Sequence, residues 1–265
     1  MNLLLLEGTA FCLYFASSIL LIKDIKENRY KKIALSIAWL ASLAHLTSIS
    51  LLTWSKQGLD FSFFHTASII SLIIAFILLF ASFGKPVEKL GIALFPVAAL
   101  MLALDYIFPS TATIGQHYSL AMKMHILSSI IAFSLLTIAA FQALILALQN
   151  KQLKSHNPGR LMLSFPPLQA MESLLFQMIS TGLLFLSVSL LSGFIFIEDL
   201  FAQHLVHKTI LSIVAWVIFS SLLIGRQLYG WRGKTAIRWT LYGFICLLLA
   251  YFGSKLVLEL ILNKV

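Results

Sequence analysis

Long apolar runs alternate with short polar connections along the whole chain. Each run has about 20 residues, the length that an α-helix needs to cross the hydrocarbon core of a bilayer. The apolar residues are continuous rather than placed at every second position, so the pattern favours helices over the strands of a membrane barrel. We expect eight spans, at residues 3–22, 33–54, 64–83, 90–108, 122–148, 174–197, 207–228 and 236–262.

The composition agrees with a membrane protein. Hydrophobic residues make up 60% of the 265 residues and charged residues 11%, and the mean hydropathy is +0.94. A soluble domain carries about 25% charged residues and could not hide this much apolar surface. The predicted fold class is therefore an all-α, polytopic membrane helix bundle, in contact with membrane lipid and forming a single transmembrane domain over residues 1–265.

Basic residues gather in every second connection. The first, third, fifth and seventh connections together hold 14 of the 19 Lys and Arg residues. Short basic loops mark the cytoplasmic side, so we expect both termini outside the cytoplasm, in a bacterial inner membrane. This topology accounts for the net charge of +9 and gives no reason to expect a nucleic-acid partner. The longest connection, residues 149–173, contains Pro166 and Pro167, which predict an extended cytoplasmic connector.

Motifs for soluble-substrate catalysis are missing from the sequence. It contains no P-loop, no H-E-x-x-H and no G-x-S-x-G. The two cysteines, Cys12 and Cys246, lie inside predicted spans and form no C-x-x-C. Nothing in the sequence therefore predicts an enzyme.

Five of the seven histidines fall on the predicted outer side of the membrane. Neutral imidazole is a common metal ligand and an axial ligand of haem iron, and we favour His125 and His207 as such a pair. His45 differs because it lies about twelve residues into its span, near mid-membrane, where ionisable groups are functional candidates. Interfacial histidines also cap helices or meet headgroups, and that alternative stays open. The five outer histidines are His65, His117, His125, His204 and His207.

Three segments of the second half resemble the CcsA/CcmC-type cytochrome c assembly superfamily. Residues 118–125 read Tyr-Ser-Leu-Ala-Met-Lys-Met-His, like the family segment in which an external histidine opens a helix. Residues 165–176 resemble its Pro-x-Leu-Glu connector, and residues 226–234 its closing arginine and Gly-Trp-x-Gly loop. The resemblance is clearest over residues 115–262, and the last segment is most similar to the YpjD inner-membrane branch.

The resemblance implies haem b as cofactor and a role with other cytochrome c maturation components. His125 matches the family's first external ligand, and His45 could match an intramembrane one. The family's tryptophan-rich platform is reduced here to Lys208 and Trp216, and the terminal external histidine is missing. His207 or His204 would then supply the second axial ligand.

In this mechanism Lys123 and Lys208 could pair with the haem propionates. Trp216 could pack on a flat ligand, or simply on a neighbouring helix. Two other functions fit the sequence less well. A transporter-like permease component would need matching broken helices, which are not seen. A membrane scaffold or regulator that has lost haem would explain the reduced platform.

Overall fold

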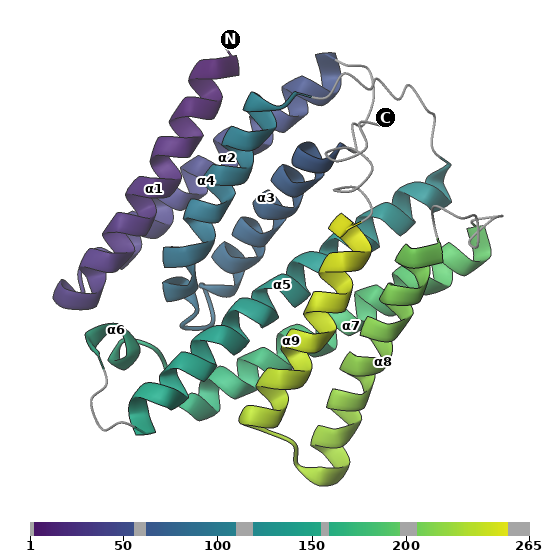
Figure 1. The fold of residues 1–265 in the computed structure, drawn as a ribbon. Coiled ribbons are helices and arrows are strands. Elements are labelled where there is room, and N and C mark those ends of the chain that lie inside the picture. The colour runs from purple at the N-terminus through teal and green to yellow at the C-terminus, as the bar shows by residue number, and fades with distance from the viewer. Residues whose placement is uncertain (1–2, 56–61, 110–118, 155–158, 197–205, 254–265) are drawn as a thin grey trace. The chain divides into compact units, whose positions relative to one another are not determined.

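The computed structural model describes residues 3–55, 62–109, 119–154, 159–196 and 206–253. All regular elements in these ranges are helical, which confirms the all-α prediction (Figure 1). Eight of the helices are long and apolar enough to cross a membrane, as the sequence predicts. The elements are α1 Leu3–Glu27, α2 Lys31–Ser55, α3 Phe63–Ala81, η1 Glu88–Leu90, α4 Gly91–Ile107, α5 Leu120–Lys154, α6 Arg160–Leu163, α7 Leu168–Phe196, α8 Val206–Tyr229, α9 Lys234–Leu248 and η2 Leu249–Gly253.

Several helices extend beyond the predicted apolar spans. α5 continues to Lys154 and α7 begins at Leu168, so the predicted connector over residues 149–173 is partly helical. Lys151 and Lys154 occupy the last turn of α5, where cations interact favourably with the helix carboxyl end. The carbonyl of Pro167 accepts from Ala170 N and Met171 N at the start of α7. Prolines thus precede the helix, where their missing N–H is tolerated.

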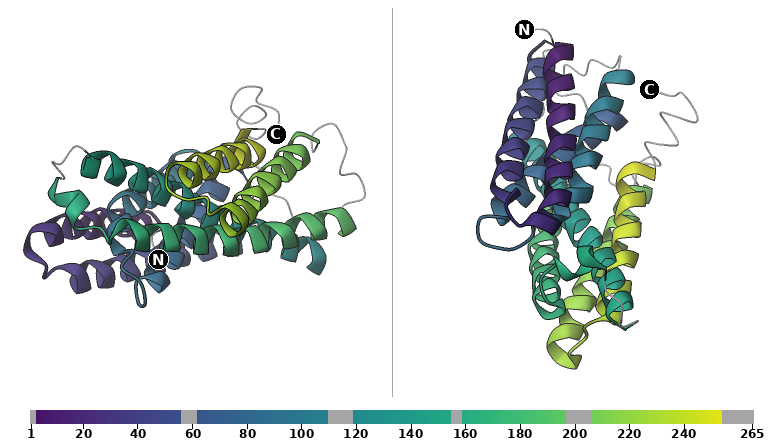
Figure 2. Two further views of the ribbon diagram at one scale, coloured as in Figure 1. Left: turned by 90° about the horizontal axis from the view of Figure 1, so that it is seen from below. Right: turned by 90° about the vertical axis from the view of Figure 1, so that its left-hand side faces the viewer.

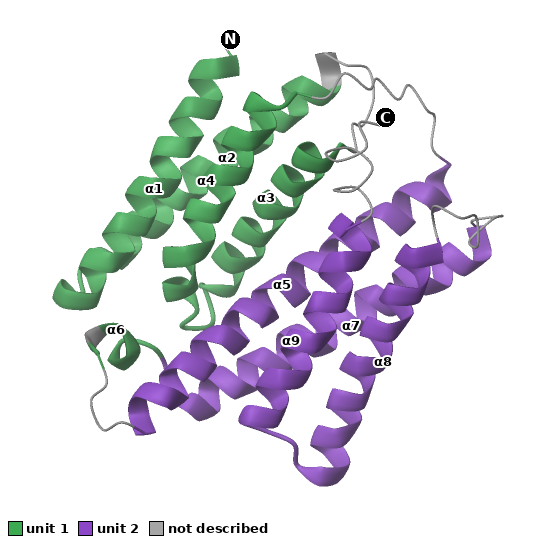
Figure 3. Ribbon diagram, viewed as in Figure 1, with its two compact units in different colours: residues 1–116, 159–165 green, residues 117–158, 166–265 purple. Residues whose placement is uncertain are grey.

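Contacts between Cα atoms group the chain into two compact units (Figure 3). Unit 1 comprises residues 1–116 and 159–165, and unit 2 comprises residues 117–158 and 166–265. The single transmembrane domain that the sequence predicts stays a prediction.

Unit 1 is built from α1, α2, α3 and α4. α1 packs on α2 and α4, and α3 packs on α4 and α2. Ala10, Ala34 and Ala38 are fully buried, and such small residues let membrane helices approach closely. α4 continues through Pro96, which cannot donate to the carbonyl of Ile92. Ser18 Oγ on α1 donates to that carbonyl at 2.8 Å, so the gap in the α4 hydrogen-bond pattern is filled from a neighbouring helix.

Unit 2 is built around α5, which packs on α7 and α9, while α8 packs on α7 and α9 (Figure 2). Gly182 of α7 lies against α5: a Cβ there would be 2.8 Å from Leu136 Cγ. Leu136 and Ile179 are fully buried in this packing. The close approach of α5 and α7 therefore depends on Gly182. This approach also places polar groups of α7 next to α5.

Candidate functional site

His125 is the predicted site residue whose surroundings best suit ligand binding. It lies in the second turn of α5 and is half-buried. Its Nδ1 is 2.9 Å from the carbonyl oxygen of Ser189 and 3.1 Å from Ser192 Oγ, both on α7. A carbonyl oxygen can only accept, so Nδ1 carries the proton. Nε2 of the neutral ring then carries a lone pair.

Two oxygens of α7 hold the His125 ring in place. Ser192 Oγ donates to the Ser189 carbonyl at 2.9 Å, which leaves the hydroxyl oxygen free to accept from Nδ1. Histidine ligands of metals commonly donate their other ring N–H to a carbonyl in this way, which fixes the tautomer and the ring orientation. Among the described residues nothing hydrogen-bonds to Nε2 of His125, so this nitrogen is available to a ligand.

Three of the other predicted residues of unit 2 lie in the first turn of a helix. His207 is exposed in the first turn of α8, and Lys208 follows it, partly buried. Lys123 is exposed in the first turn of α5. Trp216 is 36% exposed, and its Nε1 donates to Ser187 Oγ at 2.8 Å. Both α5 and α8 pack on α7. His117 and His204 lie outside the described residues.

His45 has different surroundings in unit 1. It is 0% exposed, with Nε2 2.9 Å from Ser68 Oγ and Nδ1 3.4 Å from the hydroxyl of Tyr14. The same hydroxyl donates to Ser42 Oγ at 3.2 Å. Both ring nitrogens of His45 are thus hydrogen-bonded, and binding of iron at either one would require one of these bonds to break.

Unit 1 also contains a histidine–aspartate pair and a hydrogen-bonded glutamate. His65 Nδ1 lies 2.9 Å from Asp105 Oδ2, so Asp105 pairs with a histidine of its own unit. Glu7 Oε1 accepts from Ser48 Oγ at 2.7 Å, whereas no described residue hydrogen-bonds to the buried Oε2. Sequence reasoning missed Glu7, although an acid inside the first apolar run is a signal that could have identified it.

A cluster of charges joins α1, α2 and η1 at the other end of unit 1. Asp24 Oδ1 accepts from the backbone N–H groups of Tyr30 and Lys31, both at 2.9 Å. Asp24 Oδ2 accepts from Lys89 Nζ at 2.6 Å, and Lys31 Nζ lies 2.9 Å from Glu88. The sequence analysis treats Lys31 and Lys89 as topology signals, and the structure shows that they are also paired with acids.

The family-like segments of unit 2 contact one another. Glu172, from the segment over residues 165–176, accepts from the backbone N–H of Gly233 and lies 3.3 Å from Arg232 Nη2. Arg226 Cζ lies 3.8 Å from the ring centroid of Phe176. Gly233 has a positive φ of 57°, which glycine adopts without strain. The segments therefore form a clamp that fixes the start of α9 against α7.

No group of three or more His, Cys, Asp or Glu side chains in the described part of the chain could hold a metal ion. The arrangement that the structure does show is a single histidine nitrogen oriented by a neighbouring helix. Such a nitrogen suits a prosthetic group that brings its own equatorial ligands to the metal.

Eight span-length helices define a multi-pass membrane protein. The family described as "Cytochrome C assembly protein" matches residues 10–262, and the chain belongs to this family. The match also covers most of unit 1, beyond the region of clearest resemblance.

Curated relatives agree with this assignment. The "Inner membrane protein YpjD" of Escherichia coli strain K12 is 29% identical over 242 residues, covering 89% of this chain and 90% of the relative. An uncharacterized 28.8 kDa protein of Azospirillum brasilense is 31% identical over 157 residues, or 58% of each chain. The "Cytochrome c biogenesis protein CcsA" of Prochlorococcus marinus strain NATL1A is 26% identical over 110 residues, covering 41% of this chain and 34% of the relative. No solved structure matches.

Proposed function

We propose that this protein binds haem b at one surface of the membrane and handles it for cytochrome c biogenesis, with His125 as an iron ligand. The observation that carries the proposal is the hydrogen bond from His125 Nδ1 to the Ser189 carbonyl, because it directs the Nε2 lone pair outward from the α5–α7 contact. Membership of the cytochrome c assembly family supports haem as the ligand.

Other side chains of unit 2 suit a haem in three respects. His207 offers a second, exposed imidazole on a helix of the same unit. Lys123 and Lys208 offer cations for the propionates, and Trp216 offers an aromatic surface whose indole N–H is held by Ser187. A bound haem would supply an iron centre that takes up histidine nitrogens as axial ligands. His204 remains the alternative second ligand, and His45 a further candidate in unit 1.

We further propose that the His125 end of unit 2 faces away from the cytoplasm, in an inner membrane with both termini external. In unit 1 the α1–α2 and α3–α4 connections lie at one end, and in unit 2 the α5–α7 and α8–α9 connections lie at one end (Figure 1). These are the connections that carry most of the basic residues. Labelling of single cysteines at Lys123→Cys and Lys234→Cys by a membrane-impermeant reagent tests this: intact spheroplasts should label the first and not the second.

Absorbance spectroscopy of the haem-loaded protein tests the ligand assignment. Wild type and variants are purified in mild detergent, loaded with haem and freed of excess by gel filtration. We expect wild type to retain haem with a low-spin, bis-imidazole spectrum, and His125→Ala to lose most of it. His125→Gly should regain the spectrum when free imidazole is added. His156→Ala, at a histidine predicted to lie in a cytoplasmic connection, is the matched control and should behave like wild type.

Each other outcome has a definite meaning. Unchanged haem retention in His125→Ala would remove this residue from the site. If His207→Ala retained haem but the spin state of the iron changed, His207 would be assigned as the second ligand. An unaltered spectrum would favour His204 as that ligand. Failure of the wild type to retain any haem would favour the alternative of a scaffold that has lost its cofactor.

A further inference from the structure

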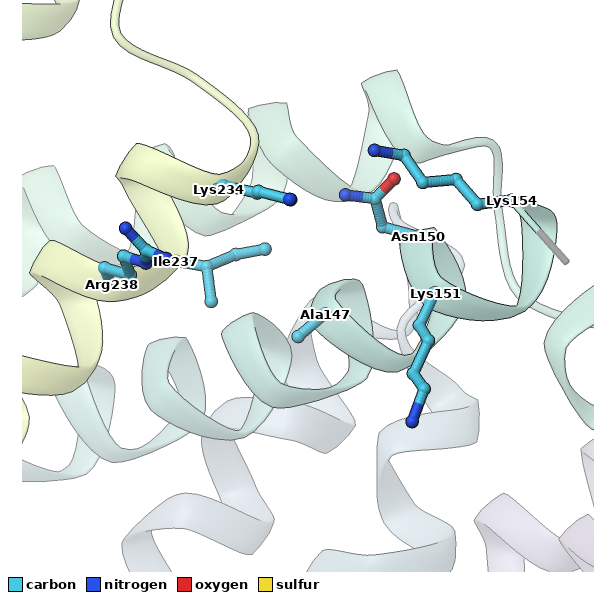
Figure 4. Close-up of a pocket in the computed structure, with 7 residues that line it drawn as sticks. All are labelled: Ala147, Asn150, Lys151, Lys154, Lys234, Ile237 and Arg238. Carbon is cyan, nitrogen blue, oxygen red and sulfur yellow. The ribbon is translucent and has the colours of Figure 1, made fainter.

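A cavity of about 300 Å³ lies in unit 2 between the end of α5 and the start of α9 (Figure 4). Its lining contains four cationic side chains and one amide, and no carboxylate among the described residues. Ala147 and Ile237 supply its apolar part. The cationic and amide residues are Asn150, Lys151, Lys154, Lys234 and Arg238.

We propose that this cavity binds a phosphate ester, and that its natural occupant is the phosphate of an anionic phospholipid headgroup. The proposal is independent of haem binding, because the cavity lies at the opposite end of α5 from His125. From His125 to Lys151 the helix rises by about 39 Å.

The electrostatic setting favours an anion. In the close-up the ammonium of Lys234 and the amide of Asn150 extend toward one another from α9 and α5, whereas Lys151 extends away from them (Figure 4). Lys234 is also the first residue of α9, so the partial positive charge of the helix N-terminus adds to that of the side chains. The nearby acid Glu172 is already paired with Arg232 and the Gly233 N–H. No described carboxylate lines the cavity, so a phosphate would meet the positive charges of Lys234 and Arg238 there.

The clamp between α7 and α9 fixes the backbone next to the α9 cations of this cavity. Glu172 fixes the backbone at Gly233, and Gly233 directly precedes Lys234. Ile237, one turn further on, is buried, which holds the same face of α9 toward the α5 side. The cations of α9 thus have a defined position relative to those of α5.

The length of α5 favours a lipid over a soluble anion. Its 35 residues span about 52 Å, whereas a bilayer including headgroups is about 40–45 Å thick. Because the hydrocarbon core is only about 30 Å thick, the polar last turns of α5 extend past it to the level of the headgroups, where lipid phosphates are abundant. The apolar floor of Ala147 and Ile237 also suits the glycerol and upper acyl region of a lipid. Basic pockets between membrane helices on the cytoplasmic side are known to bind such headgroups.

Native mass spectrometry of the full chain in detergent tests the proposal. The probes are phosphatidylglycerol, phosphatidylcholine with the same acyl chains, and inorganic phosphate. Wild type is compared with Lys234→Gln/Arg238→Gln. The matched control is Lys23→Gln/Lys32→Gln, which removes the same charge from exposed positions of unit 1.

We expect wild type to bind phosphatidylglycerol in preference to phosphatidylcholine. Because each cation near a membrane surface contributes roughly fivefold to the affinity for anionic lipid, the α9 double variant should lose on the order of 25-fold and the control far less. An equal loss in both double variants, or no preference for the anionic lipid, would overturn the proposal. Tight binding of inorganic phosphate that the α9 variant abolishes, without lipid preference, would support a phosphate site and overturn the lipid as its occupant. Measured melting temperatures within a few degrees of wild type exclude misfolding as the cause.

Discussion

The two units use their polar residues in opposite ways. In unit 1 each buried ionisable side chain of the described residues has a partner within the unit: Glu7 with Ser48, Asp24 with Lys89, His45 with Ser68, His65 with Asp105 and Glu88 with Lys31. In unit 2 the His125 Nε2 has no such partner among the described residues, and several cations surround a cavity instead. Unsatisfied polar groups are costly in a membrane protein unless they serve a ligand.

This difference separates stabilising groups from candidate binding groups. Most polar contacts of unit 1 join its residues to one another, so their removal should mainly affect stability, although Glu7 Oε2 and Glu88 Oε2 are buried without a hydrogen bond from a described residue. In unit 2 the candidate binding groups are His125 Nε2 and the cavity cations Lys234 and Arg238, so their removal should mainly affect binding. Substitutions in each unit test that division.

Asp24→Ala should have the largest effect, because it removes three acceptor contacts at once and leaves Lys89 buried without its counter-charge. Breaking a buried ion pair from one side costs about 3–5 kcal/mol. The free energy of unfolding, measured by reversible denaturation in mixed micelles, should fall by about this amount. In the double variant Asp24→Ala/Lys89→Met the loss should be smaller than in Asp24→Ala alone, since no uncompensated charge remains. A loss below about 1 kcal/mol in the single variant would show that the pair does not stabilise unit 1.

The Asp24 pair also shows what sequence reasoning could and could not predict. The eight spans followed from apolar runs because helix length and bilayer thickness are fixed quantities. Pairing between Asp24 and Lys89 joins residues 65 positions apart, and nothing in the local pattern specifies which acid meets which base. The position of Lys89 in a basic loop could therefore predict the membrane topology, but it could not predict that Lys89 pairs with Asp24.

The candidate site was predictable to a similar degree. His125 was recognisable because it opens an apolar helix within a family-like segment. The carbonyl of Ser189 that orients its ring was not, since backbone groups carry no sequence signature and the contact depends on α5–α7 register. His45 was a weaker candidate in the sequence, and the contacts of both its nitrogens emerge only from the packing of α1, α2 and α3.

Gly182→Val should have the next largest effect, and it should affect both stability and binding. Its side chain would collide with Leu136 at the α5–α7 contact, and overpacking of this kind costs about 1–3 kcal/mol. Because the same contact aligns Ser189 with His125, haem retention should also fall. Gly8→Ala is the control, since a Cβ at Gly8 meets nothing within 4 Å; it should leave the melting temperature and haem retention unchanged. Equal behaviour of the two variants would contradict the tight α5–α7 packing.

Ser192→Ala should weaken haem binding with little effect on stability. It removes one of the two oxygens near His125 Nδ1 and leaves the Ser189 carbonyl in place. Loss of a group that orients a metal ligand reduces affinity by about 10–100-fold, and we expect the lower end because one acceptor remains. A haem titration followed by absorbance measures this. Ser192→Thr keeps a hydroxyl and should recover most of the affinity. A loss shared equally by both variants would indicate a packing effect instead.

Glu172→Gln should have the smallest effect and tests whether the clamp works through charge or through the backbone. Glutamine keeps an oxygen that can accept from the Gly233 N–H and removes only the ion pair with Arg232, whose side chain is 66% exposed. Exposed ion pairs contribute about 0.2–1 kcal/mol, so Glu172→Gln should lower stability by that amount, and added salt should shrink the difference from wild type.

Glu172→Ala removes the acceptor as well and should cost more, in stability and in phosphatidylglycerol binding, because the start of α9 loses its anchor. If Glu172→Gln and Glu172→Ala were equally damaging, the charge rather than the backbone contact would position α9, and the cavity between α5 and α9 would depend on an electrostatic contact that salt can weaken.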